Sequence, residues 1–97
     1  KLSQKNNVDP INVINALKGG WADSKVLQTH GLRMIKNDFK PRGKNFSQLK
    51  DMINILDCAK NKKLELPLSK IVKKMYNQLV KKGLGNYDHS SLYKNYK

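Results

Sequence analysis

The segment that most constrains how this chain can fold is residues 45–62, which read NFSQLKDMINILDCAKNK. On a helical wheel its apolar residues cover well over half of the circumference, whereas a helix with one solvent-exposed face has a narrower apolar stripe. These residues are Phe46, Leu49, Met52, Ile53, Ile55, Leu56 and Ala59. We therefore expect a central helix that packs on more than one side.

Lys50 lies at the margin of this apolar stripe, one helical turn after Phe46. Asp51 follows it and points roughly a quarter-turn away. A lysine at the edge of a buried helix can lay its methylenes on apolar surface and direct its ammonium into a neighbouring cleft. Lys50 is therefore the residue of this helix whose ammonium can reach a neighbouring cleft.

Capping signals predict the helices before this segment. Asp9-Pro10 is typical of a helix start, and Gly19-Gly20 is typical of a helix end. A second helix is expected from about Asp23, with either Asp23 or Ser24 as its cap. Gly31 within that helix indicates close packing or a bend.

Similar signals predict the helices that follow. A start signal at residues 67–69 predicts a helix over 69–82, and glycines in 83–85 predict its end. Asp88 or Ser90 is expected to cap a last helical turn. No stretch alternates with the period of two that marks a strand, so we predict an all-α fold of about five helices.

The charge balance limits the partners this chain can have. Lys and Arg total 20 against 7 Asp and Glu, which gives a net charge of +13. The cations are dispersed lysines, with arginine only at Arg33 and Arg42, and arginine is the residue that favours bidentate phosphate recognition. This pattern favours a lysine-coated soluble protein over a nucleic-acid or membrane partner.

Other features point to the compartment. One cysteine, Cys58, excludes an internal disulfide and fits a reducing environment. No apolar run has the length of a membrane span, and the layout of a signal peptide is absent. We therefore expect a cytoplasmic location.

The usual arrangements of catalytic and metal-binding residues are missing. His30 and His89 are far apart in sequence and neither has a second ligand at metal-binding spacing, so no metal site is predicted. Asp51 and Asp57 are six residues apart and lie on different faces of a helix, which does not suit a carboxylate pair. No glycine-rich nucleotide-binding loop is present. The residues alone indicate a basic helical domain.

Four strings occur in order along the chain: GGWADSKVLQTHGLRM, DFKPRGKNFSQLKDM, LPLSKIVKKMYNQL and GLGNYDHSSL. Together they resemble the C-terminal helical domain of the β-hydroxyacid dehydrogenases, a family that includes 3-hydroxyisobutyrate dehydrogenase and 2-hydroxy-3-oxopropionate reductase. The resemblance runs from about Val8 to Leu92. It implies a multi-helix domain like the C-terminal domain of 6-phosphogluconate dehydrogenase.

The resemblance also implies a function. Members of this family are NAD- or NADP-dependent oxidoreductases that interconvert a 3-hydroxyacid, such as 3-hydroxyisobutyrate, and its semialdehyde or ketoacid. In the family an N-terminal Rossmann domain holds the dinucleotide, and a helix upstream of this chain carries the catalytic lysine. Residues 1–97 would then be one C-terminal substrate and dimerisation domain of a longer two-domain enzyme, without a catalytic residue and inactive alone. The expected partners are a hydroxyacid substrate and further copies in a dimer or tetramer.

The resemblance assigns roles to particular residues. Lys50 matches the lysine of a Lys-Asp motif that lines the cleft and contacts the cofactor, and Asp51 matches its acidic neighbour. Gly43, Lys44 and Phe46 are further candidates for the substrate cleft. Many relatives have an aromatic residue at the position of Gly43. Two alternatives remain at this point: a basic nucleic-acid-binding module, and a purely structural interaction domain.

Overall fold

The computed structural model describes all 97 residues, and none of them forms a strand. Five α-helices are followed by one 3-10 helix, and the bounds are α1 (Leu2–Lys5), α2 (Pro10–Leu17), α3 (Lys25–Lys36), α4 (Asn45–Asn61), α5 (Pro67–Lys81) and η1 (His89–Asn95). The predicted all-α class is therefore confirmed. None of these helices combines the length and the apolar character that a membrane span needs.

Local capping chemistry explains where α2 and α3 begin. The Asp9 side chain accepts a hydrogen bond from the Ile11 amide at 2.9 Å, and Pro10 occupies the first turn of α2. The Ser24 hydroxyl accepts from the Leu27 amide at 2.9 Å at the start of α3, so Ser24 is the cap. These contacts satisfy amide groups that the first turn of a helix leaves without partners.

The predicted start of the α5 helix at Ser69 is wrong, because α5 begins two residues earlier at Pro67. Leu66 is the N-cap residue and offers no side-chain hydrogen bond. Proline suits the first helical position because it lacks the amide hydrogen that would have no partner there. Ser69 is therefore a helical residue of the first turn.

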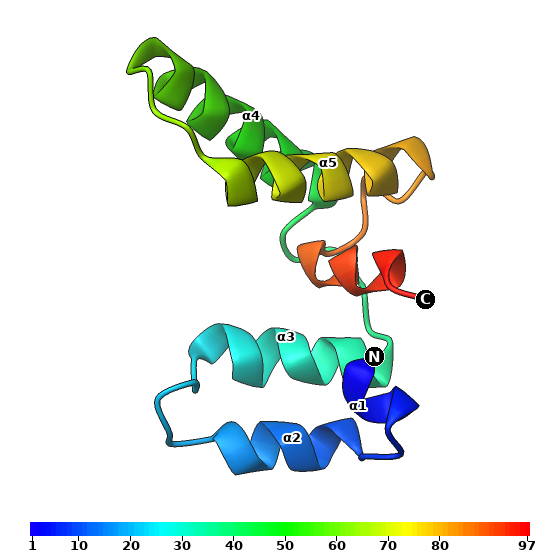
Figure 1. Ribbon diagram of the computed structural model, residues 1–97. Helices are drawn as coiled ribbons and strands as arrows, with labels where there is room; N and C mark the ends of the chain where they lie inside the picture. The colour runs from blue at the N-terminus through cyan, green and yellow to red at the C-terminus, as the bar shows by residue number, and fades with distance from the viewer.

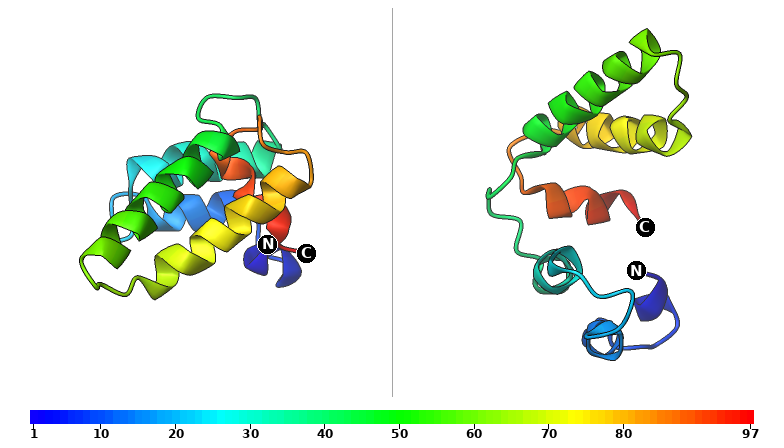
Figure 2. Two further views of the ribbon diagram at one scale, coloured as in Figure 1. Left: turned by 90° about the horizontal axis from the view of Figure 1, so that it is seen from above. Right: turned by 90° about the vertical axis from the view of Figure 1, so that its left-hand side faces the viewer.

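The elements form a stack whose middle layer is η1 (Figure 1). Helices α2 and α3 pair at one end of the stack and α4 and α5 pair at the other, with α1 beside α2. The C-terminal η1 contacts α3 on one side and both α4 and α5 on the other. The N- and C-termini lie near each other (Figure 2). There the Tyr93 hydroxyl donates to Gln4 Oε1 at 2.8 Å.

The expectation that α4 is a central helix covered on more than one side is wrong for this chain. Helix α4 packs along α5 and touches η1, and its other side has no neighbour. Consequently Phe46, Ile53 and Ile55 stay 50%, 37% and 42% exposed. The radius of gyration is 15.0 Å, above the roughly 13 Å typical of a compact 100-residue domain. Several apolar faces of the stack therefore remain open.

Gly31 confirms the close packing predicted from the sequence. A Cβ atom added there would lie 2.8 Å from Ile14 Cδ1. Ile14 is the buried residue of α2, so the missing side chain lets α2 and α3 approach closely.

Candidate functional site

Three of the five predicted site residues lie in the segment that leads into α4. This segment, residues 43–46, is joined by backbone hydrogen bonds to residues 85–89. The His89 amide donates to the Gly43 carbonyl at 2.7 Å, the Asn45 amide to Tyr87 at 2.9 Å and the Phe46 amide to Gly85 at 3.0 Å. Lys44 forms an isolated bridge with Asp88. The start of α4 is thus held against the segment that leads into η1, which fixes where Gly43, Lys44 and Phe46 lie.

The fully buried carboxylate of Asp88 anchors this junction. It accepts hydrogen bonds from the Gly43 amide at 3.2 Å and the Ser90 amide at 3.1 Å, and from the Ser90 hydroxyl at 2.5 Å. Arg33 Nη1 of α3 lies 3.3 Å from both carboxylate oxygens. Burial alone would raise the pKa of Asp88, but these donors and the Arg33 charge outweigh it and hold the pKa at about 2. The ionised Asp88 therefore ties together three segments of the chain.

The space beside Gly43 is filled by the His89 ring. A Cβ atom added to Gly43 would lie 2.9 Å from His89 Cε1 and 3.0 Å from Nδ1. An aromatic side chain, which the resemblance leads one to expect here, has no room while His89 keeps this position. In this chain the ring next to the segment leading into α4 is therefore the imidazole of His89.

Phe46 lies over Gly85 at the other edge of the junction. A Cβ atom on Gly85 would come within 2.3 Å of Phe46 Cε2, so only glycine allows this ring position. The ring is still 50% exposed. Phe46 therefore offers apolar surface next to the start of α4.

Lys50 and Asp51 lie further along α4 and outside this junction. The Lys50 side chain is 68% exposed, and its Nζ lies 3.2 Å from Asp51 Oδ1. An exposed ion pair of this kind contributes little to stability. The Lys50 ammonium is therefore exposed to solvent in this chain. A cleft around it would have to be lined by further residues, outside α4 and α5.

A contact between the two histidines was missed by the sequence analysis. His30 of α3 and His89 of η1 bring their Nε2 atoms within 3.2 Å of each other. Burial, the charge of His89 and the charge of Arg33 lower the pKa of His30, while Asp88 opposes them. No group of three or more His, Cys, Asp and Glu side chains is placed to hold a metal ion. The contact between His30 and His89 therefore links α3 to η1.

Comparisons with known proteins agree on one family. Residues 1–96 match the family model described as "NAD-binding of NADP-dependent 3-hydroxyisobutyrate dehydrogenase". The chain is 38% identical over 91 residues to the 2-hydroxy-3-oxopropionate reductase of Escherichia coli, covering 94% of this chain and 31% of that protein. It is 30% identical over 92 residues to the uncharacterized oxidoreductase YkwC of Bacillus subtilis, covering 95% of this chain and 32% of that protein.

A solved structure shows the same fold. The 3-hydroxyisobutyrate dehydrogenase of Salmonella typhimurium superposes with a TM-score of 0.90 at 20% identity, covering 98% of this chain and 33% of that chain. The chain therefore spans about a third of the length of the relatives that it matches. The alternative of a nucleic-acid-binding module receives no support from these comparisons.

Proposed function

This chain belongs to the NAD-binding family of NADP-dependent 3-hydroxyisobutyrate dehydrogenases, and we propose that it is the helical substrate and oligomerisation domain of a longer NAD(P)-dependent oxidoreductase. The reaction proposed is the interconversion of a 3-hydroxyacid and its semialdehyde or ketoacid. The observation that carries this proposal is the alignment of nearly the whole chain with a third of a named hydroxyacid reductase. The choice between NAD and NADP belongs to the domain that binds the dinucleotide.

The proposed contribution of this chain is a cation on a face that another domain can cover. Phe46, Lys50 and Ile53 are spaced three and four residues apart, so they share one face of α4. The side chains of all three are exposed. When a dinucleotide-binding domain covers this face, the Lys50 ammonium can donate to anionic oxygens of the cofactor or substrate. Asp51 limits the positions that Lys50 adopts.

The same reasoning explains why the chain alone should not transfer hydride. Dinucleotide pyrophosphate is usually held by a glycine-rich turn and the N-terminus of the helix that follows it. No such motif occurs in these 97 residues. Lys50 can therefore add a contact to a cofactor that is held elsewhere, but it cannot replace that site.

Nicotinamide turnover tests this function. The longer protein that contains this chain would be assayed by the absorbance of the reduced nicotinamide, with a panel of 3-hydroxyacids and semialdehydes and with both cofactors. We expect turnover with at least one pair, and none from residues 1–97 alone. An inactive but folded longer protein would contradict the proposal. In that case a salt titration of DNA binding would test the nucleic-acid alternative, because such binding depends steeply on salt.

A further inference from the structure

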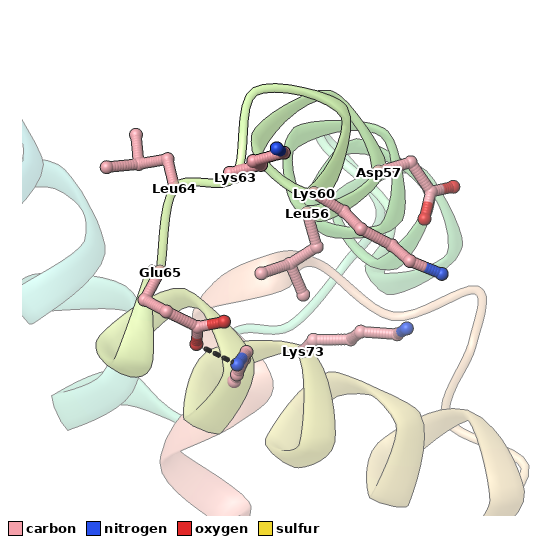
Figure 3. Close-up of a pocket in the computed structure, with 8 residues that line it drawn as sticks. Leu56, Asp57, Lys60, Lys63, Leu64, Glu65 and Lys73 are labelled. Atoms are coloured by element: carbon pink, nitrogen blue, oxygen red, sulfur yellow. Dashed lines mark hydrogen bonds and ion pairs between the residues drawn. The ribbon is translucent and has the colours of Figure 1, made fainter.

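A hollow of about 690 Å³ lies between the end of α4 and the start of α5 (Figure 3). This size is within the range of small-molecule sites. The hollow is lined by residues from the end of α4, the connecting loop and the first turns of α5, namely Leu56, Asp57, Lys60, Lys63, Leu64, Glu65, Lys70 and Lys73. Lys50 is not among them. The hollow is therefore a feature of the helix pair that the proposed function does not use.

Lys73 is unusual among the lysines of this chain. It is half-buried, whereas every other lysine is exposed. It forms no ion pair with a carboxylate, because the pairs in the structure are Arg33–Asp88, Arg42–Asp38, Lys50–Asp51 and Lys70–Glu65. A lysine can lay its methylene chain on neighbouring groups while its ammonium stays accessible. The Lys73 ammonium is therefore available to an anionic ligand in the hollow.

A second ammonium approaches the same side of the hollow. Figure 3 shows the Lys60 and Lys73 side chains reaching toward one side from the two helices, with Leu56 between them and Asp57 near their ends. Lys60 also has no ion-pair partner. An anion placed between them could accept a hydrogen bond from each helix. Such a ligand would join the end of α4 to the start of α5.

The charges and apolar groups of the lining indicate the class of ligand. The lining includes four lysines and two carboxylates, an excess of two positive charges. Glu65 is already paired with Lys70. A phosphate ester carries about −1.5 to −2 charges at neutral pH, which matches this excess. Leu56 and Leu64 offer apolar surface to an organic group. We propose that this hollow binds a small phosphate ester, with the phosphate between Lys60 and Lys73 and its organic part on Leu56.

Titration with phenyl phosphate would test this site. Backbone-amide NMR of the 97-residue chain, at about 0.15 M salt to screen diffuse attraction, would report where the ligand binds. We expect shifts confined to residues around the hollow, and weaker binding of inorganic phosphate, which lacks the apolar group. Lys73→Gln should weaken phenyl phosphate binding by about tenfold, the usual effect of one charge-assisted hydrogen bond. Lys60→Gln provides a second variant of an exposed residue, with the same expected direction.

Lys74→Gln is the matched control. Lys74 is an exposed neighbour on α5 that does not line the hollow, and its substitution changes the net charge equally. We expect it to alter affinity by less than about twofold, because exposed charges are screened. Equal losses in the Lys73 and Lys74 variants would mean diffuse attraction to a basic chain and would overturn the proposal. Tighter binding of hexaglutamate than of phenyl phosphate at the hollow would also overturn it, since it would indicate a docking site for an acidic protein segment.

Discussion

The carboxylate of Asp88 illustrates how much one residue contributes to this fold. Its partners come from α3, from the segment leading into α4 and from the first turn of η1. Asp88→Asn would remove the charge that Arg33 faces and would place an amide group among hydrogen-bond donors. We expect a loss of about 2–4 kcal/mol in the free energy of unfolding, measured by urea denaturation, because the buried hydrogen-bond donors lose their carboxylate and the partly buried Arg33 loses its partner.

Asp38→Asn is the control for this substitution. Asp38 and Arg42 form an ion pair at 2.7 Å, with side chains 33% and 43% exposed. We expect a much smaller loss than for Asp88→Asn, since exposed ion pairs contribute little. Equal losses in the two variants would show that the burial of Asp88 does not matter.

Asp88 also makes stability depend on pH. Its pKa is lowered from 3.8 to about 2, so its stabilising effect is present above pH 3.8 and is lost as the pH falls toward 2.

His30 gives a separate pH dependence at milder acidity. Burial and the neighbouring charges of His89 and Arg33 lower its pKa below 6.5, against the opposing effect of Asp88. The unfolded chain therefore binds this proton more tightly, and stability should fall as the pH drops below about 6.5. We expect the urea midpoint of the wild type to fall more between about pH 7.5 and 5 than that of His30→Gln. Parallel pH profiles for the two proteins would contradict this account.

At the scale of elements, the contact of Phe46 with Gly85 fixes how α4 begins. In Gly85→Ala the new methyl group would overlap the ring, because three ring atoms lie within 2.8 Å of its position. We expect a loss of about 1–3 kcal/mol in the free energy of unfolding, as overpacking usually causes. Adding Phe46→Ala should recover part of this loss, because the two side chains then no longer overlap. Strict additivity of the two substitutions in a double-mutant cycle would show that the overlap is not the cause.

The sequence predicted those elements whose signals are local. The Asp9 cap and the start of α4 at Asn45 agree with the structure, and of the two caps offered for α3 the structure has Ser24, because caps and periodicity act within a few residues. The start of α5 was misplaced because both Pro67 and Ser69 can stand near a helix start. The central place of η1 was not predicted, because it depends on contacts between distant segments.

The candidate site also depends on contacts between distant segments, which local sequence signals do not predict. The Arg33–Asp88 and His30–His89 contacts join residues 55 and 59 positions apart, and no local pattern marks them. The sequence placed Lys50 at the margin of an apolar stripe, but it could not show that α4 lies at the end of the stack.

At the scale of the whole molecule, the open stack predicts self-association of the isolated chain. Only 10 of its 97 residues are buried, and the exposed apolar side chains include Phe46, Ile53 and Ile55 on α4. Exposed apolar faces of this kind favour association between copies. We expect at least a dimer by light scattering at micromolar concentration, and a larger monomer fraction for Ile53→Glu. A monodisperse monomer of the wild-type chain would contradict this prediction.

Lys50 is the residue through which we propose that this helical chain contacts the cofactor of a hydroxyacid oxidoreductase. The most direct measurement is the kcat/KM and the cofactor Kd of Lys50→Ala in the longer protein, with exposed Lys74→Ala as the control. We predict a loss of about 10- to 100-fold in kcat/KM and weaker cofactor binding for Lys50→Ala, as expected when one charge-assisted contact is removed. Lys74→Ala should retain wild-type values. Wild-type turnover and affinity in a folded Lys50→Ala variant would contradict the claim.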